Sequence, residues 1–226
     1  MISSKDNELL DTYKRLRNLQ KALNGQFVDQ LSKKSVLECA KKLGLAKGKV
    51  IIFDSPDELP ALMDFCLYNS RMGGKNVIER YAQQTPPPPE SDEMKVLQAM
   101  LDSYFSVFMV EQVYAGRGVL LSSFGEEKVF LMDLGLGDTA VTGMSMAGRV
   151  LPFPDFHMSA GAFLPLYEEP VSKAVFPILE KWVLHHPDMG RTKLSPGLSA
   201  SFSAEVIRAS LRAGALKSVK YSDAWA

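Results

Sequence analysis

Cysteine and histidine are scarce in this sequence, and their scarcity limits the chemistry that the chain can support. There are two cysteines and three histidines among 226 residues. Cys39 and Cys66 both fall inside segments with helical spacing, which indicates buried free thiols rather than a disulfide, a zinc site or a nucleophile. No Gly-x-Ser-x-Gly motif is present, so a Ser or Cys nucleophile with a histidine base is not expected. We expect no cofactor.

Long hydrophobic runs are also absent. No apolar run reaches the roughly 18 residues that a membrane helix needs, and the first six residues, Met1 to Asp6, lack the apolar core of a signal peptide. We therefore expect no membrane partner and a cytoplasmic location. Hydrophobic residues make up 46% of the chain and charged residues 23%, which is ordinary for a globular protein with a substantial core.

The net charge is zero, but the charges are unevenly distributed. Lys and Arg outnumber Asp and Glu by 11 to 5 in residues 1–50 and by 8 to 4 in residues 171–226. Acidic residues lead by 10 to 4 in residues 51–112 and by 7 to 3 in residues 113–170. The basic ends can face the acidic middle, within one chain or across a homo-oligomer. Alternatively, a basic end can be a footprint for nucleic acid.

The basic N-terminal segment defines the nucleic-acid alternative. Its candidate contacts are Lys14, Arg15, Arg17, Lys21, Lys33, Lys34, Lys41 and Lys42. The run from Ala40 to Leu45 resembles the first half of a helix-turn-helix, which a recognition helix should follow. Instead, Gly48 and a β-branched run lie between Lys47 and Phe53, and these residues favour a strand. A helix-turn-helix is therefore not favoured.

Residues 1–104 are predicted to form a helical part. Apolar residues recur at helical spacing from Glu8 to Leu23, and Asn24-Gly25 is expected to end this helix. Four further helices are expected, each with capping residues at its start: 36–43, 55–71, one that follows Asn76 and one that follows Ser91. The prolines Pro86–Pro89 form an extended segment, either a ligand for a proline-binding domain or a stiff spacer.

Residues 105–168 are predicted to form a small β module. Short runs of β-branched and aromatic residues alternate with Gly-rich turns, which is typical of strands in hairpins. The expected strands are 107–114, 119–124, 128–133, 146–153 and 156–159. Five short strands joined by tight turns favour a closed, SH3-like barrel, because closure hides the strand edges.

Residues 169–226 are predicted to be helical again. A helix is expected over 171–186, a loop over 188–201 and a last helix over 204–213, followed by a tail with Tyr221 and Trp225. The fold class is therefore α+β, with a helical N-terminal part, a barrel-like middle and a helical C-terminal part.

Two motifs in the β module could carry chemistry. The run Gly135-Leu136-Gly137-Asp138 follows a strand, but a phosphate loop needs a helix after it, and a barrel turn is favoured. Four residues at strand ends, Asp133, Asp138, Asp155 and His157, could hold a divalent metal, with Arg149 placed for phosphate. No metal-binding spacing supports this site, and aspartates at strand ends commonly form turns.

Several segments resemble a group of uncharacterised bacterial proteins. The resemblance rests on the segments 62–68, 74–81 and 91–93, the proline run, Gly135 to Ala140, and Ala147 to Leu151. Some members of the group are similar to proteins that carry a Cys-rich SEC-C zinc motif. The tail of this chain, Ser222 to Ala226, has no cysteine, so the resemblance implies no zinc. It implies no activity either.

The sequence therefore favours a non-catalytic interaction module with a protein partner. Two alternatives stay open. One is a nucleic-acid-associated protein that uses the basic N-terminal helices, and the other is a metal-dependent hydrolase that uses the strand-end aspartates.

Overall fold

The computed structural model describes residues 4–124, 128–189 and 194–217. The tail residues Tyr221 and Trp225 and the expected connection at 125–127 lie outside these residues. The helices are α1 (Ser4–Asp29), α2 (Lys33–Leu43), α3 (Glu58–Asn69), α4 (Val77–Gln84), α5 (Asp92–Leu101), α6 (Leu134–Thr139), α7 (Glu169–His185) and α8 (Pro196–Arg212). The strands are β1 (Ala46–Lys47), β2 (Val50–Ile51), β3 (Tyr104–Tyr114), β4 (Gly118–Ser122), β5 (Val129–Met132), β6 (Ser145–Pro152), β7 (His157–Ser159) and β8 (Leu164–Pro165).

Capping residues start α4 and α5 and end α2 as predicted, whereas α3 starts at Glu58 rather than at the predicted residue 55, and Asp57 before it makes no capping hydrogen bond. Asn76 forms a capping box with Glu79 at the start of α4, and the Ser91 side chain accepts a hydrogen bond from an amide of α5. Gly44 ends α2 in the left-handed conformation, with φ of 79°. Helix α2 starts at Lys33 rather than at the predicted residue 36, because Ser32 caps it. The chain then forms the β1–β2 hairpin instead of a recognition helix.

The predicted end of α1 at Gly25 is wrong. The helix continues through Gly25 to Asp29, because the residues on either side of this glycine are held in the core. Leu23 and Phe27 lie one turn apart and are both buried, and the Phe27 ring packs edge-to-face on Tyr81 of α4. Tertiary packing thus outweighs the cost of glycine inside a helix, which is about 1 kcal/mol.

Five strands close into a barrel, as the sequence predicts. The order around it is β3-β4-β5-β7-β6, and β6 pairs back with β3. All neighbours are antiparallel except β5 and β7. A register shift between Val110 and Gln112 bends β3, so that its first half pairs with β6 and its second half with β4. This order, with one parallel pair and a helix after the third strand, is that of an OB-fold, whereas an SH3-like barrel has antiparallel neighbours throughout.

The helix after the third strand is α6, where the sequence predicted a turn. Asp133 caps it by accepting a hydrogen bond from the amide of Leu136. Leu136 packs against the residues inside the barrel. Of the two glycines that suggested a turn, Gly137 is needed for a close approach, because a Cβ on it would lie 2.7 Å from the backbone nitrogen of Gly118.

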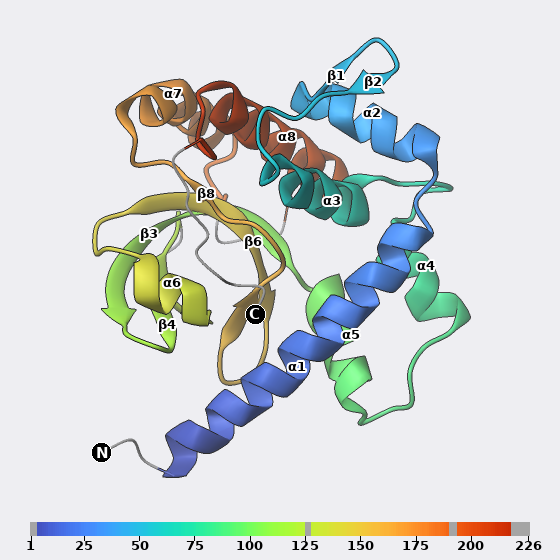
Figure 1. Cartoon of the computed structure of the whole chain (residues 1–226), viewed down its shortest axis with the longest axis vertical. Coiled ribbons are helices and arrows are strands. Elements are labelled where there is room, and N and C mark those ends of the chain that lie inside the picture. The colour runs from blue at the N-terminus through green and yellow to red at the C-terminus, as the bar shows by residue number, and fades with distance from the viewer. Residues whose placement is uncertain (1–3, 125–127, 190–193, 218–226) are drawn as a thin grey trace.

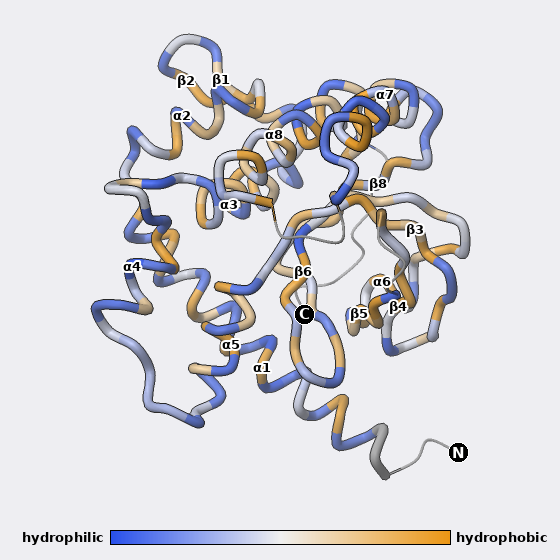
Figure 2. Tube along the Cα trace, turned by 180° about the vertical axis from the view of Figure 1, so that it is seen from behind, coloured by the Kyte–Doolittle hydropathy of each residue, from blue (hydrophilic) through white to orange (hydrophobic). Residues whose placement is uncertain are grey.

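Residues of the barrel strands alternate in direction and belong to three separate apolar clusters. Phe108 and Val110 of β3 point into the barrel. Phe105 and Val107 of the same strand join the cluster of α2, α3, α7 and α8, whereas Leu151 of β6 joins the cluster of α1, α4 and α5. The two helical layers therefore cover two sides of the barrel (Figure 1). Hydrophobic and hydrophilic positions alternate along α1, as expected of a helix with one buried face (Figure 2).

The C-terminal helices were predicted in part. Helix α7 lies where expected, but α8 starts at Pro196, inside the predicted loop. Ser195 caps this helix and Pro196 is its first residue, which is a standard start signal that the Gly- and Ser-rich composition obscured. Phe202 of α8 is fully buried against Phe105, Phe124 and Trp182.

Candidate functional site

A groove on the outside of the barrel is the best candidate for a binding site. Its volume is about 270 Å³, and it lies where the second and third barrel strands meet the β3–β4 turn and the start of α1. Its lining is mostly apolar and consists of Leu9, Tyr114, Arg117, Leu120, Phe130 and Met132. Cofactor and drug pockets usually measure about 300–1,000 Å³. The groove is therefore sized for a side chain rather than for a large cofactor.

Two aromatic rings form one wall of the groove. Tyr114 lies at the end of β3, with 37% of its surface exposed, and packs edge-to-face on Phe130 of β5 at 5.4 Å between ring centroids. This geometry fixes the two rings relative to each other, and part of the tyrosine stays accessible to a ligand. The turn that follows Tyr114 is held by Asp138, which accepts a hydrogen bond from the amide of Gly116.

The groove lies on the face of the barrel where OB-folds bind their ligands. In OB-folds, the face of the second and third strands and the loop between the first two strands bind extended ligands. Here those elements are β4, β5 and the turn that carries Arg117. These residues were not predicted from the sequence, although the turn Gly116-Arg117-Gly118 between two predicted strands was the available signal.

A buried polar cluster joins the barrel to α3. Arg149 of β6 points outward and its Nε atom lies 3.3 Å from Oδ2 of Asp64 in α3, with side-chain exposures of 4% and 11%. The guanidinium also lies over the ring of Tyr68, 4.2 Å from its centroid. Arg149 Nη2, Asp64 Oδ1 and the Tyr68 hydroxyl are buried and have no hydrogen-bond partner among the described residues. Buried water commonly satisfies such groups.

Burial dominates the electrostatics of this cluster. Desolvation raises the pKa of the Asp64 carboxyl, and the attraction of Arg149 only partly opposes it. Desolvation also raises the pKa of Tyr68, with a further contribution from the charge of Asp64. Neither side chain lines the barrel groove. We therefore assign this cluster a structural role, as the joint between β6 and α3.

The strand-end residues proposed for a metal site have other roles. Asp133 caps α6 and accepts a hydrogen bond from the Ser159 hydroxyl at 2.6 Å. Asp138 holds the β3–β4 turn, Asp155 is exposed in the β6–β7 loop, and the His157 ring packs against that of Tyr104. Among the described residues, no group of three or more His, Cys, Asp or Glu side chains could hold a metal ion.

Three of the basic residues of the nucleic-acid alternative are engaged in contacts within the chain. Arg15 pairs with Asp92 of α5 at 2.6 Å, and Lys41 pairs with Glu38 at 2.9 Å. Arg17 donates a hydrogen bond to the carbonyl oxygen of Ser159 and so helps to attach α1 to the barrel. The remaining candidates, Lys14, Lys21, Lys33, Lys34 and Lys42, are exposed along α1 and α2.

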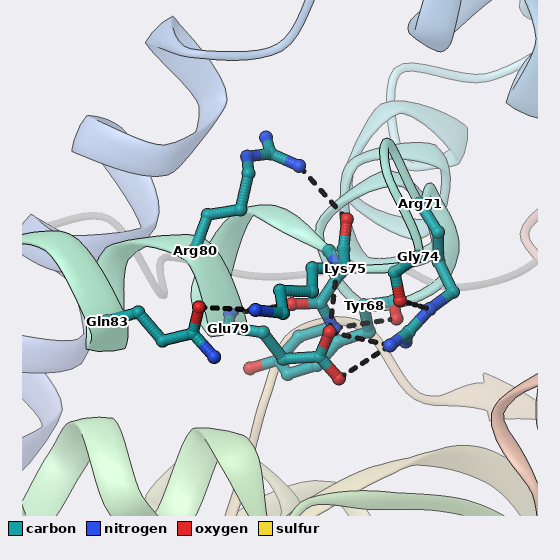
Figure 3. A network of polar contacts seen from close by, with 8 residues as sticks. Tyr68, Arg71, Gly74, Lys75, Glu79, Arg80 and Gln83 are labelled. Atoms are coloured by element: carbon teal, nitrogen blue, oxygen red, sulfur yellow. Dashed lines mark hydrogen bonds and ion pairs between the residues drawn. The ribbon is translucent and has the colours of Figure 1, made fainter.

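A second polar network lies at the turn between α3 and α4 (Figure 3). Nη2 of Arg71 donates to both carboxylate oxygens of Glu79, at 2.9 and 2.6 Å. Asn76 donates to the carbonyl oxygen of Tyr68 and caps α4. Because these contacts join the end of α3 to the start of α4, we assign the network a structural role.

A family model described as a family of unknown function, DUF7986, matches residues 7–173. The chain belongs to this family. The DUF7986 region includes nearly all of α1 and the whole barrel, and it ends inside α7, so the groove lies wholly within it. No curated protein and no solved structure matches the chain. In the part of the chain that the structure describes, no helix is long and apolar enough to cross a membrane.

Proposed function

We propose that this protein is a non-catalytic binding module, and that the barrel groove takes up an apolar side chain from a basic segment of a partner protein. The coincidence of the groove with the ligand face of the OB-fold carries this proposal. Its lining offers apolar and aromatic contact area and a single charged residue, Arg117. Such a lining recognises shape and apolar surface rather than performing chemistry.

The acidic balance of the barrel segment, rather than the single Arg117 of the lining, is the argument for a basic protein segment over nucleic acid. Acidic residues outnumber basic ones by 7 to 3 in residues 113–170, which contain most of the barrel. Single-stranded nucleic acid needs a positively charged groove beside its stacking rings. The rings of Tyr114 and Phe130 keep nucleic acid as the second candidate, because bases also stack on such rings at this face of OB-folds.

Nuclear magnetic resonance titration of the full chain tests the proposal. The probes are the peptide acetyl-Lys-Trp-Lys-amide and a short oligo(dT), each added to isotope-labelled protein at low and at high salt. The proposal predicts that the peptide shifts the backbone amides of Arg117, Leu120 and Phe130, at concentrations where oligo(dT) does not. Stronger shifts with oligo(dT), lost steeply as salt rises, would identify the groove as a nucleic-acid site. Shifts from neither probe would overturn the assignment of the groove.

The same proposal includes the cellular location of the protein. We place the protein in the bacterial cytoplasm, where its two buried cysteines would be kept as thiols. The distant similarity of its group to SEC-C proteins rests on the sequence alone. A hydrolase at the strand-end aspartates gains no support from their positions, because they serve as caps and turn contacts.

A further inference from the structure

Large apolar side chains are exposed on the β1–β2 hairpin and at the start of α3. They are Val50, Ile52, Phe53 and Leu59, and their exposed fractions range from 38% for Phe53 to 61% for Val50. We refer to these four residues as the hairpin patch. The hairpin lies beside α2 at the outer edge of the molecule, far from β4 and β5 (Figures 1 and 2). None of the four residues lines the barrel groove, so the patch is a separate surface.

The geometry of the hairpin explains why this face is open. Ala46 pairs with Ile51, and both side chains pack against the cluster of α2, α3, α7 and α8. Successive residues of a strand point to opposite faces, so Val50 and Ile52 point away from that cluster. An exposed apolar face on a short hairpin is typical of a surface that another protein covers.

Charges of opposite sign lie at the two ends of the hairpin patch. Lys47 pairs with Val50 in the register of the hairpin, which places the two side chains on the same face beside the turn. Asp54 lies at the other end, where it lines a hollow of about 520 Å³ together with Asp57 and Lys217. Of the ion pairs between described residues, none includes Lys47 or Asp54. Both charges can therefore pair with a partner.

We propose that two copies of this chain pair through the hairpin patch around a two-fold axis. Such an axis requires a self-complementary surface, because each contact occurs twice. With the two hairpins antiparallel, Val50 and Ile52 of one copy pack on the same residues of the other. The Lys47 end of each copy then lies beside the Asp54 end of the other, so that opposite charges meet on both sides of the axis.

The charge distribution along the chain supports a second copy as the occupant. The basic region of residues 1–50 changes to the acidic region of residues 51–112 within this hairpin. One surface therefore carries both signs of charge on either side of an apolar centre. A partner that is only basic or only acidic would be repelled at one end, whereas a second copy is attracted at both ends.

Sedimentation velocity of the full chain tests this interface. Four apolar side chains make a small interface, so we expect a weak dimer. The mass should be that of one chain, 25.0 kDa, in dilute solution and should rise toward twice that value between about 10 μM and 1 mM. The mass of one chain over the whole range would overturn the proposal and would leave the hairpin patch to a different protein.

Two valine variants test whether the hairpin patch forms the interface. Val50→Glu should raise the dissociation constant of the dimer at least about tenfold, because it places a charge against apolar side chains. Val141→Glu is the matched control, since Val141 has a similar exposure of 64% and lies between α6 and β6. It should leave the constant unchanged. Both valines are exposed in one copy, so neither substitution disturbs the core. Equal constants for the two variants would overturn the proposal.

Charge reversal tests the two-fold arrangement itself. In Lys47→Glu two acidic ends would meet, and in Asp54→Lys two basic ends would meet. Each variant alone should therefore dimerise at least about tenfold more weakly than the unaltered chain. A mixture of the two variants has opposite charges at both ends of the interface, and we expect it to form heterodimers as readily as the unaltered chain forms dimers. A mixture that sediments like its separate components would contradict the pairing of Lys47 with Asp54 and overturn this arrangement.

Discussion

At the scale of single residues, Arg149 and Asp64 determine how the barrel is attached to α3. Both are buried, and each is the charged partner of the other. From the sequence, Arg149 was placed near the strand-end aspartates, which suggested that it binds phosphate. The sequence does not show which side of the strand its side chain faces. A residue in a strand faces one side or the other, and only the packing of α3 on the outer face decides what Arg149 meets.

Removal of one partner of this pair should destabilise the protein strongly. We expect Arg149→Met to lower the free energy of unfolding by about 3 kcal/mol, since it leaves the Asp64 carboxylate buried and uncompensated. Lys128→Met is the matched control. Lys128 pairs with Glu111 on the surface, and its loss should cost at most about 1 kcal/mol. Urea denaturation measures both, and equal losses would contradict the account of the joint.

The same joint predicts the direction of a pH dependence. Because burial raises the pKa of Asp64 above its ordinary value of 3.8, the folded chain holds this proton to a higher pH than the unfolded chain does. The contribution of Asp64 to stability should therefore decrease as pH rises from that value through the raised pKa. The unfolding free energy of the unaltered chain minus that of Asp64→Asn, measured by urea denaturation, should fall over this range. A difference that grows with pH would mean that the attraction of Arg149 outweighs burial.

At the scale of elements, glycines show where local sequence and tertiary structure disagree. Gly25 lies inside α1, and a Cβ added there meets no atom within 4 Å. A Cβ on Gly118 of β4 would lie 2.0 Å from the carbonyl oxygen of Leu131 in β5. The first glycine is a misleading helix terminator, whereas the second is required for the barrel to close.

These two glycines give opposite predictions for the same substitution. Gly25→Ala should raise the free energy of unfolding by about 0.5–1 kcal/mol, because alanine costs less backbone entropy in a helix. Gly118→Ala should lower it by at least about 3 kcal/mol, because the barrel backbone must move apart. Thermal unfolding of the two variants measures both changes in stability. A stabilising effect of Gly118→Ala would show that the β4–β5 pairing differs from the one described.

The sequence predicted the elements better than their arrangement. All five barrel strands were found from alternation and turn residues, and the caps Asn76 and Ser91 located the starts of α4 and α5. The order of the strands was not predictable, because β7 passes between β5 and β6 and no local signal encodes that pairing. The groove could not be predicted for the same reason: Leu9 and Phe130 become neighbours only when α1 packs beside β5.

At the scale of the whole molecule, the three predicted parts share their cores. Outward residues of the barrel such as Phe105 and Leu151 are covered by helices from both ends of the chain. The boundaries at residues 104 and 168 therefore mark changes of secondary structure within one packed unit. The helices cover two sides of the barrel. The groove on β4 and β5 gives a ligand access to apolar side chains.

This sharing predicts that the barrel is not stable alone. A fragment of residues 105–168 would expose Phe105, Val107, Leu151 and Met158, which are buried in the full chain. We expect it to show no cooperative thermal transition by circular dichroism, in contrast to the full chain. A cooperative transition in the fragment would show that the barrel is an independent domain.

The affinity of the groove for the peptide acetyl-Lys-Trp-Lys-amide, with and without the Tyr114 ring, tests whether the groove is the binding site. Tyr167→Ala is the matched control, because Tyr167 is also an exposed tyrosine, at 49%, and does not line the groove. The account predicts that Tyr114→Ala weakens binding of acetyl-Lys-Trp-Lys-amide at least about fivefold, the loss of about 1 kcal/mol from one aromatic contact, whereas Tyr167→Ala leaves it unchanged. Equal affinities of the two variants would show that the groove is not the binding site.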